Sequence, residues 1–469
     1  MQPTRSRRLD SLPPWRRAFR ALPFLLLFIL PILQLQRHFQ DLQVYPFADE
    51  WLYVAVSADG ADFPWTWLWE QHGDHRIPLQ KAVQWLILDA SQLDFRALVL
   101  FNLCVAASTC MLLLLTIRNL RGNSSPWDMM VPLLVFNPMA GYALWGFHLQ
   151  FLSSAFFTSL FAWAIVRPAP RRGHLLAGLF AILLCSLCGL NGLLQAGFML
   201  PLLWLAAPAK QRSISLCASL LAAAFLLAWF WTSWSRTGEV AAAPSVAEQL
   251  QFFNGLLGAS FLPPRDGPMA TLIIGALTMG SMAAASATSA RTAELQRSAR
   301  IALLLGVVVL AQLAAVAWGR ARYQGGWQPT LAMHYGALSM LLPLLAWLAL
   351  AAKSRGRSTQ VLGLVFTAIF ATGWLQAEQW RTRYTSEMSS KKAEAYRDIK
   401  NDHLTDEALI DRNGPLYWGS DPSARKIMLD ALPILRRAYQ LKWPVTGPED
   451  SGDQRGQRGQ RPAASPLRR

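Results

Sequence analysis

Two carboxylates stand side by side in the stretch VYPFADEWLYVAV, at Asp49 and Glu50, with the aromatic residue Trp51 next to them. This stretch comes shortly after the first apolar run of the chain, at the depth expected for lipid phosphates. A carboxylate in such a place can take a proton from the hydroxyl group of a substrate. We therefore interpret Asp49 and Glu50 as the candidate catalytic residues, with a general base among them.

Groups that suit a phosphate or a sugar occur in four further segments. Arg and His side chains hold a phosphate through charge-assisted hydrogen bonds, before and after its ester bond breaks. Aromatic rings offer a platform for a sugar ring. The candidate substrate-binding residues are His72, His75, Arg76, Trp145, His148, Gln150, Asn191, Arg320, Arg322, His334 and Tyr335. Together these groups fit the transfer of a sugar from a lipid phosphate to a hydroxyl group.

Each of these residues also has a simpler interpretation. Trp and Tyr at a membrane boundary are commonly anchors, and a long Arg side chain often extends to the interface. A lone histidine such as His148 can be a satisfied loop residue, and an acidic pair is at home in a solvated loop. The prediction of a site rests on their occurrence together on one predicted side of a membrane.

The elements that must position these residues are membrane helices. Of the 469 residues 53% are hydrophobic and only 15% charged, whereas a soluble domain carries about 25% charged residues. Helices of roughly 17–25 apolar residues cross a bilayer. The long uncharged runs are residues 22–36, 97–117, 129–166, 213–235, 269–290, 301–319, 335–352 and 359–377. The sequence thus predicts an all-α polytopic membrane protein.

Basic residues collect in alternate connections between the apolar runs, which predicts a cytoplasmic N-terminus and an outer loop at 37–94. The net charge of +16 follows the same alternation, so it argues against a nucleic-acid partner. Residues 173–207 have basic flanks on both sides, and their helical length of about 50 Å allows two short arms joined at GLNG (189–192). We therefore expect about eleven membrane helices and an extracytoplasmic C-terminus.

The chain divides by composition into four parts. Residues 1–21 form a basic cytoplasmic tail that leads into an uncleaved signal anchor. Residues 22–377 form the membrane domain. Residues 378–444 are predicted to be a small extracytoplasmic helical region, and residues 445–469 a disordered tail.

The acidic pair in ADEW, placed directly after the first membrane helix, resembles the loop motif of the GT-C superfamily of polyprenyl-phosphate-sugar-dependent glycosyltransferases. More narrowly, the chain resembles a group of poorly characterised bacterial membrane proteins. The shared elements are GDHRI (73–77), WGF-x-x-Q (145–150), NG (191–192) and a GR…RY-like element (319–335). They span the first ten predicted membrane helices.

This resemblance implies a GT-C-like fold in the bacterial inner membrane, with its active face extracytoplasmic. It implies inverting transfer from an undecaprenyl-phosphate-linked sugar to a glycan or protein acceptor, with Asp49 as the base. Two departures affect the motifs: Asp74 is shorter than the Glu expected of EHR, and His334 stands where the group more often has Arg. Metal use varies in the superfamily. Asp49, Glu50 and His72 offer a set for Mg²⁺ or Mn²⁺, but no cofactor is required and we assign no metal ligand.

Two other functions fit parts of the same pattern. A polysaccharide polymerase or ligase would also use outer Arg and His side chains, in a larger outer cavity, and would depend more on Arg320 than on Asp49. A lipid or glycan transporter would place ionisable groups near the midplane, commonly on paired broken helices.

Overall fold

The computed structural model describes residues 14–38, 44–57, 62–73, 75–138, 145–233, 244–260, 267–287, 290, 292–321, 335–353, 356–400, 404–417 and 422–442. Within these ranges the chain is all-helical and has no strand, which confirms the predicted all-α class. Most of the predicted basic tail and all of the predicted disordered tail lie outside them.

The α-helices, with a few short 3-10 turns (η), follow one another along the chain. They are α2 (Pro14–His38), η2 (Ala48–Glu50), α3 (Trp51–Val54), η3 (Ala55–Ser57), α4 (Trp65–Trp69), α5 (Pro78–Ala90), α6 (Arg96–Arg121), η4 (Pro126–Met129), α7 (Met130–Val135), η6 (Gly146–His148), α8 (Leu149–Ile165), α9 (Arg172–Ser186), α10 (Leu190–Ala206), η7 (Ala209–Gln211), α11 (Arg212–Ser233), α12 (Val246–Gly258), α13 (Gly267–Ala287), α14 (Ala293–Arg320), α16 (Gly336–Ser339), α17 (Leu341–Lys353), α18 (Arg357–Lys400), α19 (Asp406–Tyr417) and α20 (Pro422–Lys442).

Seven stretches of the described helices are long and apolar enough to cross a membrane: Ala18–Gln36, Arg96–Arg121, Gly146–Ile165, Ala209–Thr232, Ala293–Arg320, Gly336–Lys353 and Arg357–Arg383. Four shorter apolar helices are Pro126–Val135, Arg172–Ser186, Leu190–Ala206 and Leu272–Ala287. These are the segments of a membrane-embedded helical protein. The count of eleven crossings and the sidedness of the chain stay predictions.

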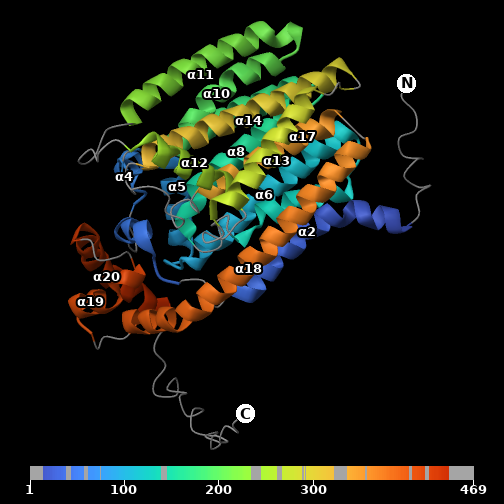
Figure 1. The fold of residues 1–469 in the computed structure, drawn as a ribbon. Coiled ribbons are helices and arrows are strands. Elements are labelled where there is room, and N and C mark those ends of the chain that lie inside the picture. The colour runs from blue at the N-terminus through green and yellow to red at the C-terminus, as the bar shows by residue number, and fades with distance from the viewer. Residues whose placement is uncertain are drawn as a thin grey trace, which may run out of the picture.

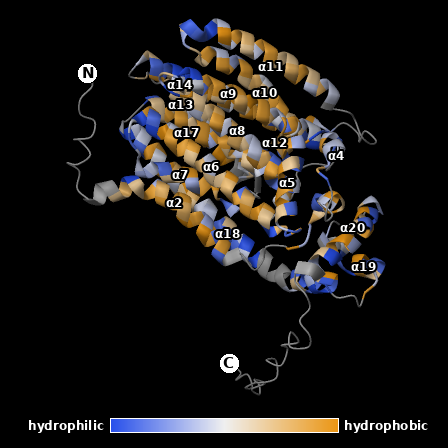
Figure 2. Ribbon diagram, turned by 180° about the vertical axis from the view of Figure 1, so that it is seen from behind, coloured by the Kyte–Doolittle hydropathy of each residue, from blue (hydrophilic) through white to orange (hydrophobic). Residues whose placement is uncertain are grey.

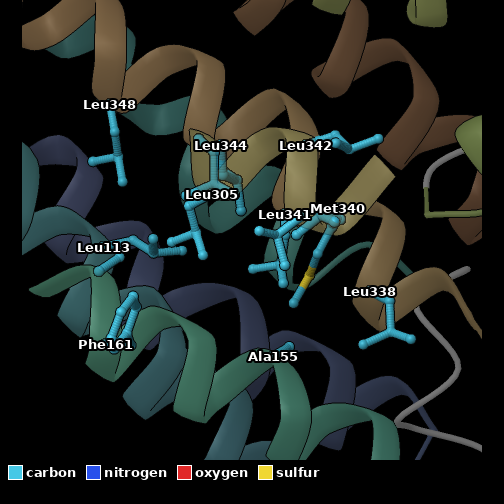
Figure 3. Packing of buried hydrophobic residues seen from close by; sticks show 14 of the residues in the cluster. Leu113, Ala155, Phe161, Leu305, Leu338, Met340, Leu341, Leu342, Leu344 and Leu348 are labelled. Atoms are coloured by element: carbon cyan, nitrogen blue, oxygen red, sulfur yellow. The ribbon is translucent and has the colours of Figure 1, made fainter. Parts of the chain in front are cut away.

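Helix α17 forms the centre of the bundle. All of its residues are buried, and it packs against α6, α13 and α14. A helix that is apolar on every face needs neighbours on every face. Figure 3 shows Leu341 and Leu344 of α17 in one cluster with Leu305 of α14, Leu113 of α6 and Phe161 of α8.

The outer helices expose apolar side chains instead of burying them. Helix α11 lies at one edge of the bundle and α2 with α18 at the opposite edge (Figures 1 and 2). Leu221 and Trp231 on α11 and Phe28 and Ile32 on α2 are among the most exposed large apolar residues. Soluble proteins rarely present apolar surfaces of this extent, so lipid is the natural contact of both edges.

The predicted two-armed segment is a helical hairpin. Helix α9 ends at Ser186 and α10 begins at Leu190, and the two pack side by side. Gly189 turns the chain between them with a φ of 94°, a left-handed value that favours glycine. The turn therefore lies where the sequence predicts it.

A second hydrophobic core joins the predicted outer loop to the end of the chain. Tyr417 of α19 packs on Tyr45 and Trp51, and the hydroxyl of Tyr439 in α20 donates to the carbonyl of Val44 over 2.7 Å. The segment after α2 and the helices after α18 thus share one end of the bundle. We call it the Asp49 end.

Helix α18 runs without a break through the predicted boundary at 377. It is 44 residues long and reaches from the far end of the bundle to the second core at the Asp49 end (Figure 1). The change in composition at 377 marks a change of surroundings within one helix rather than the end of a helix.

Candidate functional site

Asp49 and Glu50 lie in the short turn η2, where the chain begins to fold over the Asp49 end. Ala48 holds a left-handed φ of 51° just before them, a conformation that a residue with a Cβ rarely adopts. The two carboxylates meet different surroundings: Glu50 is only 3% exposed, whereas 30% of the Asp49 side chain is exposed. Asp49 is therefore the carboxylate that a substrate can reach.

Glu50 is held by backbone N–H groups. Its Oε2 accepts from the N–H of Phe47 at 2.9 Å, and its Oε1 accepts from the N–H of Phe147 at 3.2 Å. Burial raises the pKa of Glu50 to about 8, although these hydrogen bonds oppose the rise. Glu50 thus ties the acidic turn to the start of α8, and this role fits a structural group better than a base.

Gly146 allows this close approach. A Cβ at position 146 would lie 2.5 Å from the Cβ of Leu98 and 2.8 Å from Oε1 of Glu50. The carbonyl of Gly146 accepts from Nε2 of Gln84 at 2.8 Å and from Nδ2 of Asn102 at 3.1 Å. Helices α5 and α6 therefore fix the segment that carries Trp145 and His148.

Gln84 and Asn102 were not among the sequence candidates. Asn102 stands inside an apolar run that spans a membrane by length and hydropathy. A polar side chain at such a position commonly has a structural or functional partner. The presence of Asn102 in this apolar run could therefore have marked it as a candidate. The sequence gives no comparable reason to single out Gln84, because its helix lies in the predicted outer loop, where polar residues are common.

Asp49 lies beside the imidazole ring of His72. Oδ2 of Asp49 and Nε2 of His72 are 3.7 Å apart. The N–H of His72 donates to the carbonyl of His75 at 2.7 Å, which closes a tight turn at Gly73. The His72 ring also lies against Phe147, with centroids 5.0 Å apart.

A path of ring contacts leads from His72 across the Asp49 end. Phe147 stacks on Trp145 at 5.2 Å, and Trp145 meets His148 edge-on at 4.8 Å. Farther on, Phe151 lies 6.3 Å from His148 and 5.1 Å from Tyr335. These steps connect α8 with the start of α16.

The path ends at an arginine. Nε of Arg320, the last residue of α14, donates to the hydroxyl of Tyr335 at 2.8 Å. Arg320 is exposed and Tyr335 is buried. The structure therefore brings Asp49, His72, Trp145, His148, Tyr335 and Arg320 together at one end of the bundle.

The remaining described candidates lie beside this path. The His75 ring contacts Gly189 at the α9–α10 turn, where a Cβ would come within 2.9 Å of its Cδ2. The carbonyl of Asn191 accepts from Nε2 of Gln312 at 3.0 Å. Arg76 is half-buried, and its Nε has no hydrogen-bond partner among the described residues. Gln150 is buried on α8.

Two predicted site residues, Arg322 and His334, lie outside the described residues, as does Asp74. Among the residues that are described, no group of three or more His, Cys, Asp and Glu side chains could hold a metal ion. Both oxygens of Glu50 accept backbone N–H groups, so Asp49, Glu50 and His72 do not form a ligand set.

Comparison with protein-family models, with curated proteins and with solved structures found no match to this chain. The resemblance of its motifs to those of the GT-C superfamily therefore stays a prediction from the sequence.

Proposed function

We propose that the chain is a membrane glycosyltransferase that moves a sugar from a polyprenyl-phosphate donor to an acceptor hydroxyl with inversion. The observation that carries this proposal is the arrangement of Asp49. Its carboxylate is reachable, it has His72 beside it, and it stands at one end of a path of aromatic contacts that leads to Arg320. Such a transfer uses three groups: a carboxylate as the base, aromatic rings that support the sugar, and a cation that binds the phosphate.

In the reaction, an oxygen of Asp49 accepts the proton of the acceptor hydroxyl. The acceptor oxygen bonds to the anomeric carbon from the side opposite to the phosphate. The bond between the anomeric carbon and the phosphate oxygen breaks, and its electron pair stays on the lipid phosphate. Arg320 binds the charge that develops there, and the rings of Trp145 and Phe147 support the sugar.

The position of the site in the membrane supports a lipid-linked donor. Arg320 is the last residue of a helix long and apolar enough to span a bilayer, so its guanidinium belongs at headgroup level. Basic residues lie in the connections at the end of the bundle opposite to Asp49. Examples are Arg118, Arg172 and Lys210. By the distribution of basic residues the Asp49 end is extracytoplasmic, and the proposed location is the bacterial inner membrane.

The test is the release of polyprenyl phosphate by membranes that contain the full-length protein. A panel of decaprenyl-phosphate sugars labelled in the phosphate reports turnover whatever the acceptor is. Asp49→Asn should lower the rate by about 10²–10⁴-fold, the usual contribution of a general base. Asp89→Asn is a matched control, because Asp89 is an exposed acid on α5 of the same loop.

Full activity in Asp49→Asn, in Glu50→Gln and in the double variant would rule out the proposed base. Arg320→Ala separates this function from a polymerase or ligase. A loss in Arg320→Ala with an unchanged Asp49→Asn would favour the polymerase.

A further inference from the structure

A cavity of about 270 Å³ lies at the end of the bundle opposite to Asp49. Its walls come from α2, from the connection between α6 and η4, and from α17 and α18. Asn102, which fixes the candidate site, and Arg121, which lines this cavity, belong to the same helix and stand about 28 Å apart along its axis. The cavity is therefore separate from the proposed active site.

One wall of the cavity is a buried ion pair. Nη1 of Arg121 lies 2.7 and 2.9 Å from the two carboxylate oxygens of Asp128. Asp128 also accepts from Nε1 of Trp347 at 2.9 Å and from the N–H of Ser125 at 2.7 Å. The Arg121 cation balances the charge of Asp128, and the N–H groups of Trp347 and Ser125 occupy its oxygens as well, so this carboxylate does little to repel an anion.

The other walls offer a charge and donors. Arg20 is half-exposed and makes no ion pair or hydrogen bond with the described residues. Thr359 is only 6% exposed and also lines the cavity. A hydroxyl at the cavity wall can donate a hydrogen bond to a ligand or to water in the cavity.

Helix α18 adds its positive end. Its first regular backbone bond runs from the N–H of Gln360 to the carbonyl of Gly356, so the N–H groups before Gln360 have no partner in the helix. Thr359 and Gln360 of this first turn line the cavity. Unpaired N–H groups together with the helix dipole favour an anion at this place.

The surroundings of the cavity suit an ester of phosphate rather than a bare ion. Phe19, next to Arg20, and Val361, next to Gln360, are exposed apolar residues. Helices α2 and α18 both pack on η4 and α7 along the edge that faces lipid (Figure 1). A volume slightly below the ~300–1,000 Å³ of most small-molecule sites admits a headgroup but not acyl chains.

We propose that this cavity binds the phosphate group of a phosphate ester, with Arg20, the Thr359 hydroxyl and the first turn of α18 as its contacts. Arg121 and Asp128 hold the wall in shape. The site takes no part in the transfer proposed above. The ester is either a lipid headgroup that reaches in from the bilayer or a soluble phosphate compound.

The experiment uses the purified full-length protein in a neutral detergent. Its thermal unfolding midpoint is followed against dihexanoyl phosphatidic acid, dihexanoylglycerol and inorganic phosphate. A ligand that binds only the folded state raises the midpoint, and the rise increases with the logarithm of its concentration relative to Kd. Phosphatidic acid should raise the midpoint and dihexanoylglycerol, which lacks the phosphate, should not. A shift with inorganic phosphate as well identifies a soluble source, and a shift with the lipid alone identifies a headgroup.

Two variants localise the effect. Arg20→Gln and Thr359→Val should each weaken phosphatidic acid binding at least tenfold, by about 1.4 kcal/mol, with unchanged midpoints in the absence of ligand. Arg118→Gln is the control, because Arg118 is an exposed cation one turn before Arg121 and does not line the cavity. No shift with phosphatidic acid or phosphate, or the same shift in both variants as in the wild type, would overturn the proposal.

Discussion

Asp49 and Glu50 are neighbours in the chain with opposite roles in the structure. Burial against Leu98 and Gly146 costs the Glu50 carboxylate its hydration, and this outweighs the hydrogen bonds from the backbone. Asp49 keeps access to solvent and a His partner. At neutral pH one carboxyl group of the pair is thus a protonated structural link, and the other is the reachable base.

The protonation of Glu50 predicts how stability depends on pH. Its pKa is about 8 in the folded protein and near 4.5 when exposed, so between these values the folded state holds a proton that the unfolded state has lost. Stability therefore falls as the pH rises from about 4.5 to about 8, by up to ~1.4 kcal/mol per pH unit. Glu50→Gln removes this contribution.

The measurement is the difference in thermal midpoint between the wild type and Glu50→Gln across this range. All other ionisable groups are present in both proteins, so their contributions largely cancel in the difference. The advantage of the wild type should shrink as the pH rises. A difference that stays constant, or grows toward pH 8, would show that Glu50 is ionised.

At the scale of elements, hydropathy predicts the helices of the membrane domain well, because a backbone in lipid must satisfy its own hydrogen bonds. The turn of the α9–α10 hairpin follows from GLNG because Gly189 adopts the left-handed φ that the turn requires. The unbroken course of α18 also has a local cause, since no Gly or Pro occurs between Gly373 and Lys400. The change in composition at residue 377 marks the point where the side chains of α18 become more polar, and the helix itself continues.

Other features of the elements depend on contacts between distant parts of the chain. Ala48 holds its left-handed conformation where Glu50 reaches Phe147, nearly a hundred residues farther on. The packing of α19 and α20 on residues 44–57 is equally remote in sequence. Neither periodicity nor turn residues encode such contacts. The sequence therefore predicts which groups gather at one end but not which carboxylate is buried.

The packing of α20 against residues 44–57 predicts that these two elements stabilise each other. Tyr439→Phe removes the hydroxyl that donates to Val44, which should cost about 1 kcal/mol. Hydrogen exchange of residues 44–57 should become about fivefold faster if they open locally. Tyr396→Phe, which keeps the Tyr439 hydroxyl, is the control. Unchanged exchange in Tyr439→Phe would mean that α20 does not hold this segment.

The apolar edges of the whole molecule face lipid, so the axis of the helix bundle runs across the membrane. Residues 44–57 and α20 lie together at one end of this axis. The positive-inside pattern predicts that the Asp49 end is extracytoplasmic. In a variant without the native cysteines, Ala90→Cys should react with a membrane-impermeant maleimide in intact cells whose outer barrier is open. Lys210→Cys should react only after the inner membrane is permeabilised. The reverse pattern would invert the topology and move the site to the cytoplasm.

The proposed function requires that Asp49 and Arg320 serve one lipid-phosphate ligand. It is tested most directly by an experimental structure of the protein in a lipid nanodisc with bound decaprenyl phosphate, the product common to all donors of this kind. We expect the phosphate next to Arg320, with Asp49 facing the same space beyond the rings of Trp145 and Phe147. A phosphate bound away from Arg320, or an Asp49 side chain that faces another part of the surface, would contradict it.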